Sequence, residues 1–258
     1  MSDLRTRAIT ALIGLILISI VLFIGGFALK GTILLVSILA IYEMSRALNL
    51  INIKLNIIAI MVGLISIIGL QTLNLNIFSS LIVVFFVLAI SYLFSNKISL
   101  VDSGITMLIF YYIPLNLSLL ISLDKTPFLY LVFIIAFSTD TFAYLTGANF
   151  GKIKLLESVS PKKSVEGFIG GILGCLICSI FYLMYFNLNF SILSVIFIVL
   201  ASVMGQIGDL FASKIKRLAR IKDYSNLLPG HGGVMDRIDS IIFIIPLIYS
   251  LLNIVNNL

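Results

Sequence analysis

Long runs of apolar residues fill most of this sequence and set the first limit on its fold. Of the 258 residues, 60% are hydrophobic and only 11% are charged. A helix needs about 20 mainly apolar residues to cross the hydrocarbon core of a bilayer. Runs close to this length occur repeatedly, and so apolar a composition excludes a soluble globular protein. We therefore expect an all-α, polytopic integral membrane protein.

About nine spans can be placed along the chain. The first lies within residues 1–26, which have the charge and hydropathy of a signal peptide but lack a convincing small-residue cleavage site. The others are expected at 31–48, 55–71, 77–94, 103–122, 127–147, 165–186, 190–211 and 238–255. We expect them to form one integral membrane domain, 1–258, with 1–126 as a scaffold and 127–258 carrying the site.

Basic residues are distributed unequally between the loops that these spans create. With nine spans, Lys30 and Lys125 fall on one side of the membrane, and every other Lys or Arg falls on the other. Because Lys-rich and Arg-rich loops stay in the cytoplasm, we expect the N-terminus and both charged loops to be cytoplasmic, in the cell (inner) membrane. The net charge of +6 comes mostly from loops, so it suggests anionic ligands and the bilayer as partners, and no nucleic acid.

The longest polar stretch is residues 213–240, SKIKRLARIKDYSNLLPGHGGVMDRIDS. Its first half is rich in Lys and Arg, which suits a ligand with several phosphate oxygens. Its centre, Pro-Gly-His-Gly-Gly, permits sharp turns and a close approach of backbone N–H groups to a ligand. Its end carries Asp236 and Asp239, which share one face if the last span is helical. Carboxylates beside a cationic run suggest a hard-metal site next to a polyphosphate site.

Two segments further back bring polar residues to the same side. Asp140 lies in STDTFAY (138–144), inside a span, where a carboxylate costs about 2.5 to 3.5 kcal/mol on insertion scales. We therefore expect it to face a cavity, a cation or a hydrogen-bond donor. In SPKKSVEG (160–167), Lys162 and Lys163 precede a helix expected to begin with Ser164 as its N-cap, which is a natural anion site.

Near the end of another span, Asp209 shares a helical face with Gln206 and Ser213, so we expect it to point into the same polar site.

We do not expect Glu43 to belong to this site. It lies near a helix end, three residues before Arg46, and the spacing favours an interfacial ion pair.

These residues carry a family resemblance. The pattern S-x-apolar-K-R-x4-K-D-x-S-x2-L-P-x-H-G-G-V-x-D-R-I-D runs without a gap from Ser213 to Asp239. It resembles the signature of the phosphatidate cytidylyltransferases of bacterial type, also called CDP-diacylglycerol synthases. STDTFAY and SPKKSVEG are also similar to that family. The resemblance covers roughly residues 138–240, and the N-terminal half only by its layout of apolar spans.

The resemblance implies transfer of CMP from CTP to phosphatidic acid, which gives CDP-diacylglycerol and pyrophosphate in phospholipid biosynthesis. It implies a requirement for Mg²⁺, raises K⁺ as a second ion, and makes a homodimer the expected assembly. The catalytic residues would be Asp209, Asp236, Asp239 and Lys222, with Asp209 and Asp236 as the metal ligands. The substrate-binding residues would be Lys162, Lys163, Lys216, Arg217, His231, Arg237, Asp140 and Ser213.

Two alternatives stay open. A CTP-dependent polyprenol kinase would share an acidic and basic membrane site, but is not expected to carry the complete signature. A cation or proton transporter is suggested by Asp140 and Asp209 inside spans, although the acids gather at one end and no internal repeat is seen.

Cys175 and Cys178 lie within an apolar run and are interpreted as helix residues, not as redox or metal ligands.

Overall fold

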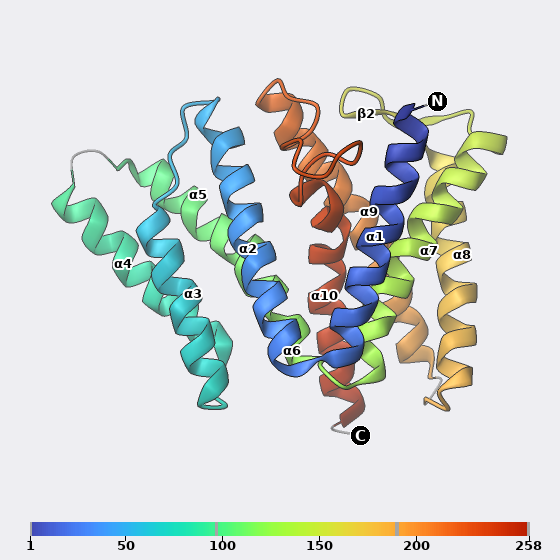
Figure 1. Ribbon diagram of the computed structural model, residues 1–258, viewed down its shortest axis with the longest axis horizontal. Coiled ribbons are helices and arrows are strands. Elements are labelled where there is room, and N and C mark those ends of the chain that lie inside the picture. The colour runs from blue at the N-terminus through green and yellow to red at the C-terminus, as the bar shows by residue number, and fades with distance from the viewer. Residues whose placement is uncertain (1, 96–97, 189–190, 257–258) are drawn as a thin grey trace.

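Helices that run between two opposite ends of the molecule make up almost all of the structure (Figure 1). The computed structural model describes residues 2–95, 98–188 and 191–256, with side chains for 9–95, 98–188 and 191–255. The N-terminal half contains α1 (Ser2–Ile24), α2 (Gly26–Asn49), α3 (Ile57–Thr72), the short 3-10 helix η1 (Ile77–Ser79), α4 (Ser80–Phe94), α5 (Leu100–Phe110), the π-helical η2 (Tyr111–Leu115) and α6 (Asn116–Ser122). The C-terminal half contains α7 (Pro127–Phe150), β1 (Lys154–Leu156), β2 (Ser160–Ser164), α8 (Val165–Tyr185), α9 (Ile192–Leu218) and α10 (Met235–Asn256).

Within the described residues, seven helical segments are long and apolar enough to cross a bilayer. They are α2, η1 with α4, α5 through α6, α7, α8, α9 and α10. Two shorter apolar helices, Ile9–Ile24 and α3, account for the remaining expected spans. The prediction of an all-α polytopic membrane protein is therefore confirmed. The hairpin of β1 and β2 was not expected, and it is too small to change the fold class.

The second span begins earlier than expected, at Gly26 in place of residue 31. Gly25, just before it, has a φ of 62°, a left-handed conformation that favours glycine. A Cβ on Gly25 would also lie 2.5 Å from the carboxylate of Asp124, which accepts a hydrogen bond of 2.8 Å from the Gly26 amide. The reversal between α1 and α2 is consequently short.

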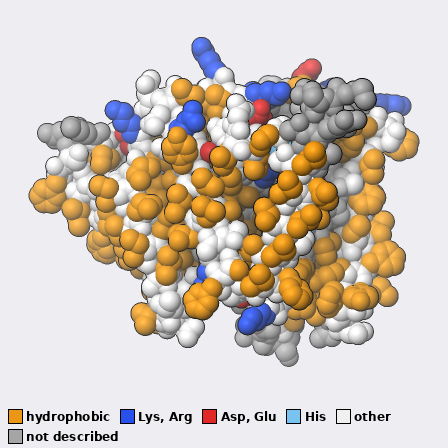
Figure 2. Space-filling model, in the orientation of Figure 1, with side chains coloured by type: hydrophobic (Ala, Val, Ile, Leu, Met, Phe, Trp, Pro, Cys, Tyr) orange, Lys and Arg blue, Asp and Glu red, His pale blue; other side chains and the backbone are white. Residues whose placement is uncertain are grey.

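The start of α1 and the connections after α2, α7 and α9 lie at one end of the molecule, and the end of α10 lies at the other (Figure 1). This end, which holds β1, β2 and residues 219–234, is the loop end. Lys and Arg gather there in Figure 2, while hydrophobic side chains cover the middle of the visible face. The start of α2 and the link between α6 and α7, which hold Lys30 and Lys125, lie at the opposite end. The side chains of Arg5 and Arg7, all of Lys97, and residue 190 lie outside the described residues.

Glycines allow two helix pairs of the C-terminal half to approach closely. A Cβ on Gly174 of α8 would overlap the ring of Phe142 in α7. A Cβ on Gly208 of α9 would overlap the backbone oxygen of Asp239 in α10. Small residues at such crossings are typical of helix packing in membranes. The result places the acid-bearing segments of α7, α9 and α10 beside one another.

The expected span 103–122 is not a uniform α-helix. Between α5 and α6 the chain widens into the π-helical η2, which contains the buried Pro114. Proline has no N–H to donate and its ring clashes with the preceding turn of an α-helix, so a wider turn accommodates it. Tyr112 and Asn116, at this wider turn, both line a groove shared with α9 and α10.

Candidate active site

A cavity of about 340 Å³ opens at the loop end between α7, α8, α9 and β2. Its polar side chains include Asp140 from α7, Lys162 and Lys163 from β2, and Gln206 and Asp209 from α9. Four of these five were expected in the site on sequence grounds, and they come from three separate elements. The cavity, which we name the Asp209 cavity, therefore combines carboxylates with lysines.

Asp209 of α9 connects this helix to β2. Its Oδ2 lies 2.6 Å from the Lys163 Nζ, and its Oδ1 accepts a hydrogen bond of 3.2 Å from the Ser213 hydroxyl. The predicted common face of Asp209 and Ser213 is thus observed. The charges of Asp140 and Asp239 are also close enough to interact with that of Asp209. Three carboxylates from α7, α9 and α10 therefore share one region with a lysine from β2.

The hairpin of β1 and β2 determines where Lys163 lies. Its two strands are antiparallel, and Ser164 at the end of β2 accepts a hydrogen bond of 3.1 Å from the Gly167 amide. This is the predicted N-cap of α8, which is confirmed. Arg217 of α9 holds the hairpin turn by donating from Nε to the Val159 carbonyl at 3.3 Å. The cavity consequently faces a helix N-terminus flanked by lysines, a favourable place for an anion.

A second Lys–Asp pair lies deeper, at the start of α10. Lys216 Nζ is 2.6 Å from Asp236 Oδ1, and the two side chains are only 10% and 4% exposed. Asp236 Oδ2 accepts hydrogen bonds of 2.9 Å from the amides of Tyr224 and Gly233. Residues 219–234 have little regular structure, so this one carboxylate holds two distant points of the loop together.

Glu43 of α2 is a site residue that the sequence interpretation missed. It is 2% exposed, and its Oε1 accepts hydrogen bonds from the Ser225 hydroxyl at 2.5 Å and the Val234 amide at 3.0 Å. The predicted ion pair with Arg46 is wrong, because the Arg46 guanidinium lies over the Tyr42 ring and Glu43 points into the loop. An acidic residue among the apolar residues of a span was the available signal.

The other predicted residues lie around residues 219–234. Arg237 donates from Nε to the His231 carbonyl at 2.9 Å, so it shapes the glycine-containing turn. The His231 Nδ1 is buried and has no hydrogen-bond partner among the described residues. Lys222 is exposed and makes no polar contact within the described part of the chain. The structure thus brings Lys163 to Asp209 and Lys216 to Asp236, and leaves Lys222 extended into solvent.

Tyr224 is buried on the side of the 219–234 loop that faces α9. Its hydroxyl donates a hydrogen bond of 3.1 Å to the Ala212 carbonyl, and the Lys216 ammonium lies 5.4 Å from the centre of its ring. Burial raises the pKa of the Tyr224 phenol well above its usual value, and the negative charges of Asp239, Asp236 and Glu43 add to the rise. Tyr224 is therefore a neutral hydrogen-bond donor.

The carboxylates can be tested for their fit to magnesium. No three His, Cys, Asp or Glu side chains among the described residues are grouped to hold a metal ion by themselves. A nucleotide-bound Mg²⁺ needs only one or two protein carboxylates, because phosphates and waters supply the other ligands. Asp209 fits this requirement, since it opens onto a cavity lined with lysines. Asp236 already binds Lys216 and two amides, and its role as a metal ligand stays a prediction.

A groove of about 600 Å³ lies between α5, η2 and α6 on one side and α9 and α10 on the other. It is mainly apolar, and two of its lining residues, Tyr112 and Asn116, each have a buried oxygen without a hydrogen-bond partner among the described residues: the Tyr112 hydroxyl and the Asn116 Oδ1. The Tyr112 ring packs edge-on against Phe211 and Phe243, and its hydroxyl lies near the charges of Asp239 and Asp209. Tyr112 therefore lines this groove and also lies near acidic residues.

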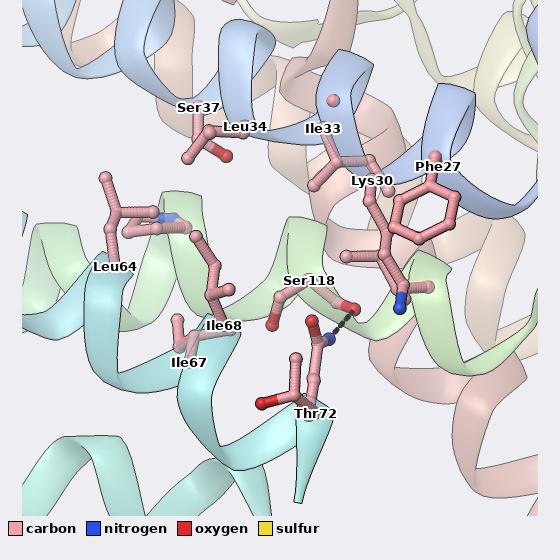
Figure 3. Close-up of a pocket in the computed structure, with 14 residues that line it drawn as sticks. Phe27, Lys30, Ile33, Leu34, Ser37, Leu64, Ile67, Ile68, Thr72 and Ser118 are labelled. Carbon is pink, nitrogen blue, oxygen red and sulfur yellow. Dashed lines mark hydrogen bonds between the residues drawn. The ribbon is translucent and has the colours of Figure 1, made fainter.

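A different cavity, of about 310 Å³, lies in the N-terminal half between α2, α3, η2 and α6 (Figure 3). Its lining is apolar apart from Lys30 and a few neutral groups, among them Gln71, which donates a hydrogen bond of 3.2 Å to the Ser118 carbonyl. Within the described part of the chain, no carboxylate lines it and it shares no residue with the Asp209 cavity. It is therefore separate from the candidate active site.

The fold and the site define a polytopic membrane protein with a charged cavity at one end of its helices. The chain belongs to the cytidylyltransferase family, whose model matches residues 5–255, and it is accordingly a nucleotidyltransferase. This match confirms the resemblance found in the sequence.

Curated relatives cover almost the whole chain. It is 34% identical over 261 residues to a protein of Staphylococcus haemolyticus and 35% identical over 266 residues to one of Staphylococcus aureus strain COL. A protein of Staphylococcus saprophyticus is 32% identical over 263 residues. Each alignment includes 96% of this chain and 99% of the relative, and all three relatives are named phosphatidate cytidylyltransferase.

Proposed function

We propose that this protein is a phosphatidate cytidylyltransferase, which transfers CMP from CTP to phosphatidic acid and releases pyrophosphate. The observation that carries the proposal is the Asp209 cavity, where a carboxylate of α9, lysines of β2 and the N-terminus of α8 meet. The names of the relatives, which align over nearly all of the chain, support the choice of substrates.

In this proposal the cavity binds the triphosphate of CTP. Lys162 and Lys163 would offer positive charges, and amides of the first turn of α8 would offer hydrogen bonds to phosphate oxygens. Asp209 would hold Mg²⁺ with help from Asp236 or Asp239, and K⁺ stays a prediction as a second ion. When bound, the magnesium ion supplies positive charge next to the phosphate oxygens.

The reaction would be an in-line displacement at the α-phosphorus of CTP. A phosphate oxygen of phosphatidic acid forms the new P–O bond, and the bond from the α-phosphorus to the bridging oxygen of pyrophosphate breaks. Such transfers need chiefly positioning and compensation of developing charge. Lys163 and Lys162, which line the cavity, would offset the negative charge on the departing pyrophosphate.

The apolar groove supplies a place for the lipid. Its walls are apolar side chains of α5, α9 and α10, which suit acyl chains, and its buried Tyr112 hydroxyl can donate to an ester or phosphate oxygen. Because Tyr112 lies near Asp239, a lipid in this groove would present its phosphate to the acidic end of α10. CTP, from the Asp209 cavity, and the lipid, from the apolar groove, would then reach the carboxylates of Asp209 and Asp239 from different directions.

Lys222, Arg217, Arg237, His231 and Lys216 are proposed to assist around the phosphates. Lys222 is the most direct to test, since it is exposed and makes no polar contact among the described residues. Lys222→Ala should raise the KM for CTP more than that for phosphatidic acid. An unchanged KM for CTP would remove it from the nucleotide site.

We further propose that the loop end is cytoplasmic and that the protein lies in the cell (inner) membrane, because CTP is made in the cytoplasm and Lys and Arg gather at that end. A homodimer stays a prediction, and the mass of the protein in detergent would test it.

The deciding experiment supplies the detergent-purified protein with phosphatidic acid, Mg²⁺ and CTP labelled at either the α or the γ phosphorus. Transfer of the α label to lipid, with an equal amount of pyrophosphate, supports the proposal. Transfer of the γ label to a polyprenol would identify a kinase. If a folded sample transfers neither label, the transporter alternative should be tested by ion flux in vesicles.

A further inference from the structure

Two Lys–Asp ion pairs among the described side chains have the same length but different surroundings. Lys163–Asp209 and Lys216–Asp236 are each 2.6 Å apart. In the first pair the side chains are 27% and 33% exposed, whereas in the second they are 10% and 4% exposed. Exposed pairs contribute little to stability, whereas separating a buried pair leaves an uncompensated charge. The first pair can therefore open at low cost and the second cannot.

We propose that Lys163 occupies the metal-binding carboxylate of Asp209 until CTP enters, and then transfers its ammonium group from Asp209 to the triphosphate. This inference rests on the proposed function. It assigns Lys163 a regulatory role in addition to phosphate binding. Metal binding at Asp209 thereby becomes dependent on the nucleotide.

The competition follows from the geometry of Asp209. Lys163 Nζ contacts Oδ2, while Oδ1 is bound by Ser213, so both oxygens have a partner. A divalent cation arriving alone must displace the ammonium group and must also tolerate its positive charge at close range. A cation arriving with a triphosphate meets neither obstacle, because the phosphates offer Lys163 more negative charge than a single carboxylate does.

Lys163 can change partner without movement of the hairpin. Arg217 holds the turn at Val159, and Ser164 is fixed as the N-cap of α8, so the backbone on both sides of Lys163 is anchored. The lysine side chain has four rotatable methylene groups and a compact charge. Lys163 and Asp209 line the same cavity of about 340 Å³, so the ammonium group can reach a phosphate within it.

The test measures, by equilibrium dialysis, how much Mn²⁺, used in place of Mg²⁺, binds to the full-length protein in detergent without lipid, and a protein-free sample corrects for Mn²⁺ held by CTP in solution. Mn²⁺ is titrated alone and with saturating CTP into the wild type, Lys163→Gln and Lys154→Gln. Lys154 is the matched control, because it is an exposed lysine of the same hairpin that does not line the cavity. Melting temperatures establish that each variant is folded.

We expect Lys163→Gln to bind Mn²⁺ alone about fivefold more tightly than the wild type, from the loss of an exposed pair and of a nearby positive charge. With CTP present, the wild type should bind Mn²⁺ more tightly than Lys163→Gln, because the variant has lost a lysine that binds the phosphates. Lys154→Gln should match the wild type in both titrations. A merely structural role for Lys163 would weaken both kinds of binding together.

The outcomes separate this inference from the proposed function. If CTP strengthens Mn²⁺ binding to the wild type but Lys163→Gln binds Mn²⁺ alone no more tightly, the displacement by Lys163 is refuted while the function stands. The same conclusion follows if Lys154→Gln strengthens binding equally, because the effect would then be one of general charge. If CTP never affects Mn²⁺ binding in the folded wild type, both the inference and the metal–nucleotide site fail.

Discussion

The Glu43 carboxylate accepts a hydrogen bond of 2.8 Å from the amide of Met235, a residue 192 positions later in the chain. Its other oxygen binds Ser225 and Val234. The first amides of a helix lack internal partners and carry partial positive charge, so a carboxylate there stabilises the helix start. A side chain of α2 therefore ties the start of α10 to residues 225 and 234 of the preceding loop.

Replacing Glu43 should disrupt the site from a distance. In Glu43→Ala, three donors lose their acceptor, and each buried loss costs about 1 to 3 kcal/mol. We expect CMP transfer to fall at least about tenfold, with faster proteolysis within residues 219–234. Glu157→Ala, which changes an exposed acid in the hairpin turn, is the control. Wild-type activity and protease resistance in Glu43→Ala would show that the contact is dispensable.

Asp236→Asn should cost stability as well as activity. The substitution leaves the Lys216 ammonium buried without a counter-charge. The cost of breaking such a pair is about 3 to 5 kcal/mol. Thermal unfolding and CMP transfer should both decline.

A second substitution separates these two effects. Adding Lys216→Met to Asp236→Asn removes the unpaired charge, so the melting temperature should recover while activity stays absent. If the single variant melts like the wild type, the pair is less important to the fold than its burial suggests.

Asp209→Asn should behave in the opposite way. Its pair with Lys163 is about one-third exposed, so its loss should change the free energy of unfolding by less than about 1 kcal/mol. Activity should nevertheless fall by about 100-fold or more, because an amide neither binds Mg²⁺ as strongly nor supplies charge. Parallel measurement of melting temperature and initial rate would check this. A rate within tenfold of the wild type would remove Asp209 from the centre of the reaction.

Tyr112→Phe should affect the lipid substrate selectively. The ring contacts with Phe211 and Phe243 remain, while the buried hydroxyl is removed. Loss of one hydrogen bond of about 1 kcal/mol predicts a rise of about fivefold in the KM for phosphatidic acid, with little change in the KM for CTP. Tyr185→Phe on the exposed face of α8 serves as the control. Equal changes in both KM values would argue against a lipid-specific role.

Much of the architecture was predictable because the bilayer imposes a simple rule on apolar length. The expected spans correspond to the observed helices, and the N-cap at Ser164 followed from local chemistry. The bend at η2 was not predicted, although Pro114 was visible as a helix-breaking residue. The strands of the hairpin were missed because three residues, Lys154–Leu156, give no reliable alternation.

The candidate site was predictable where neighbours in sequence are neighbours in space. Asp209 and Ser213 are one helical turn apart, and that contact was expected and is observed. The partners of Glu43 and Lys163 lie on other elements, and no spacing rule identifies such contacts. The predictability of the Lys216–Asp236 pair is intermediate. Both residues lie in the signature, but they are 20 positions apart and a loop brings them together.

The dependence of residues 225–235 on Glu43 also has a consequence for biosynthesis. Glu43 leaves the ribosome before the residues that bind it, and at about 5 to 20 residues per second the delay is about 10 to 40 s. During this interval α2 carries a carboxylate that lacks its eventual donors, near the end of a membrane span. A chain that stops before Met235 never supplies them. The same contact that shapes the loop can thus distinguish a completed protein from an unfinished one in the membrane.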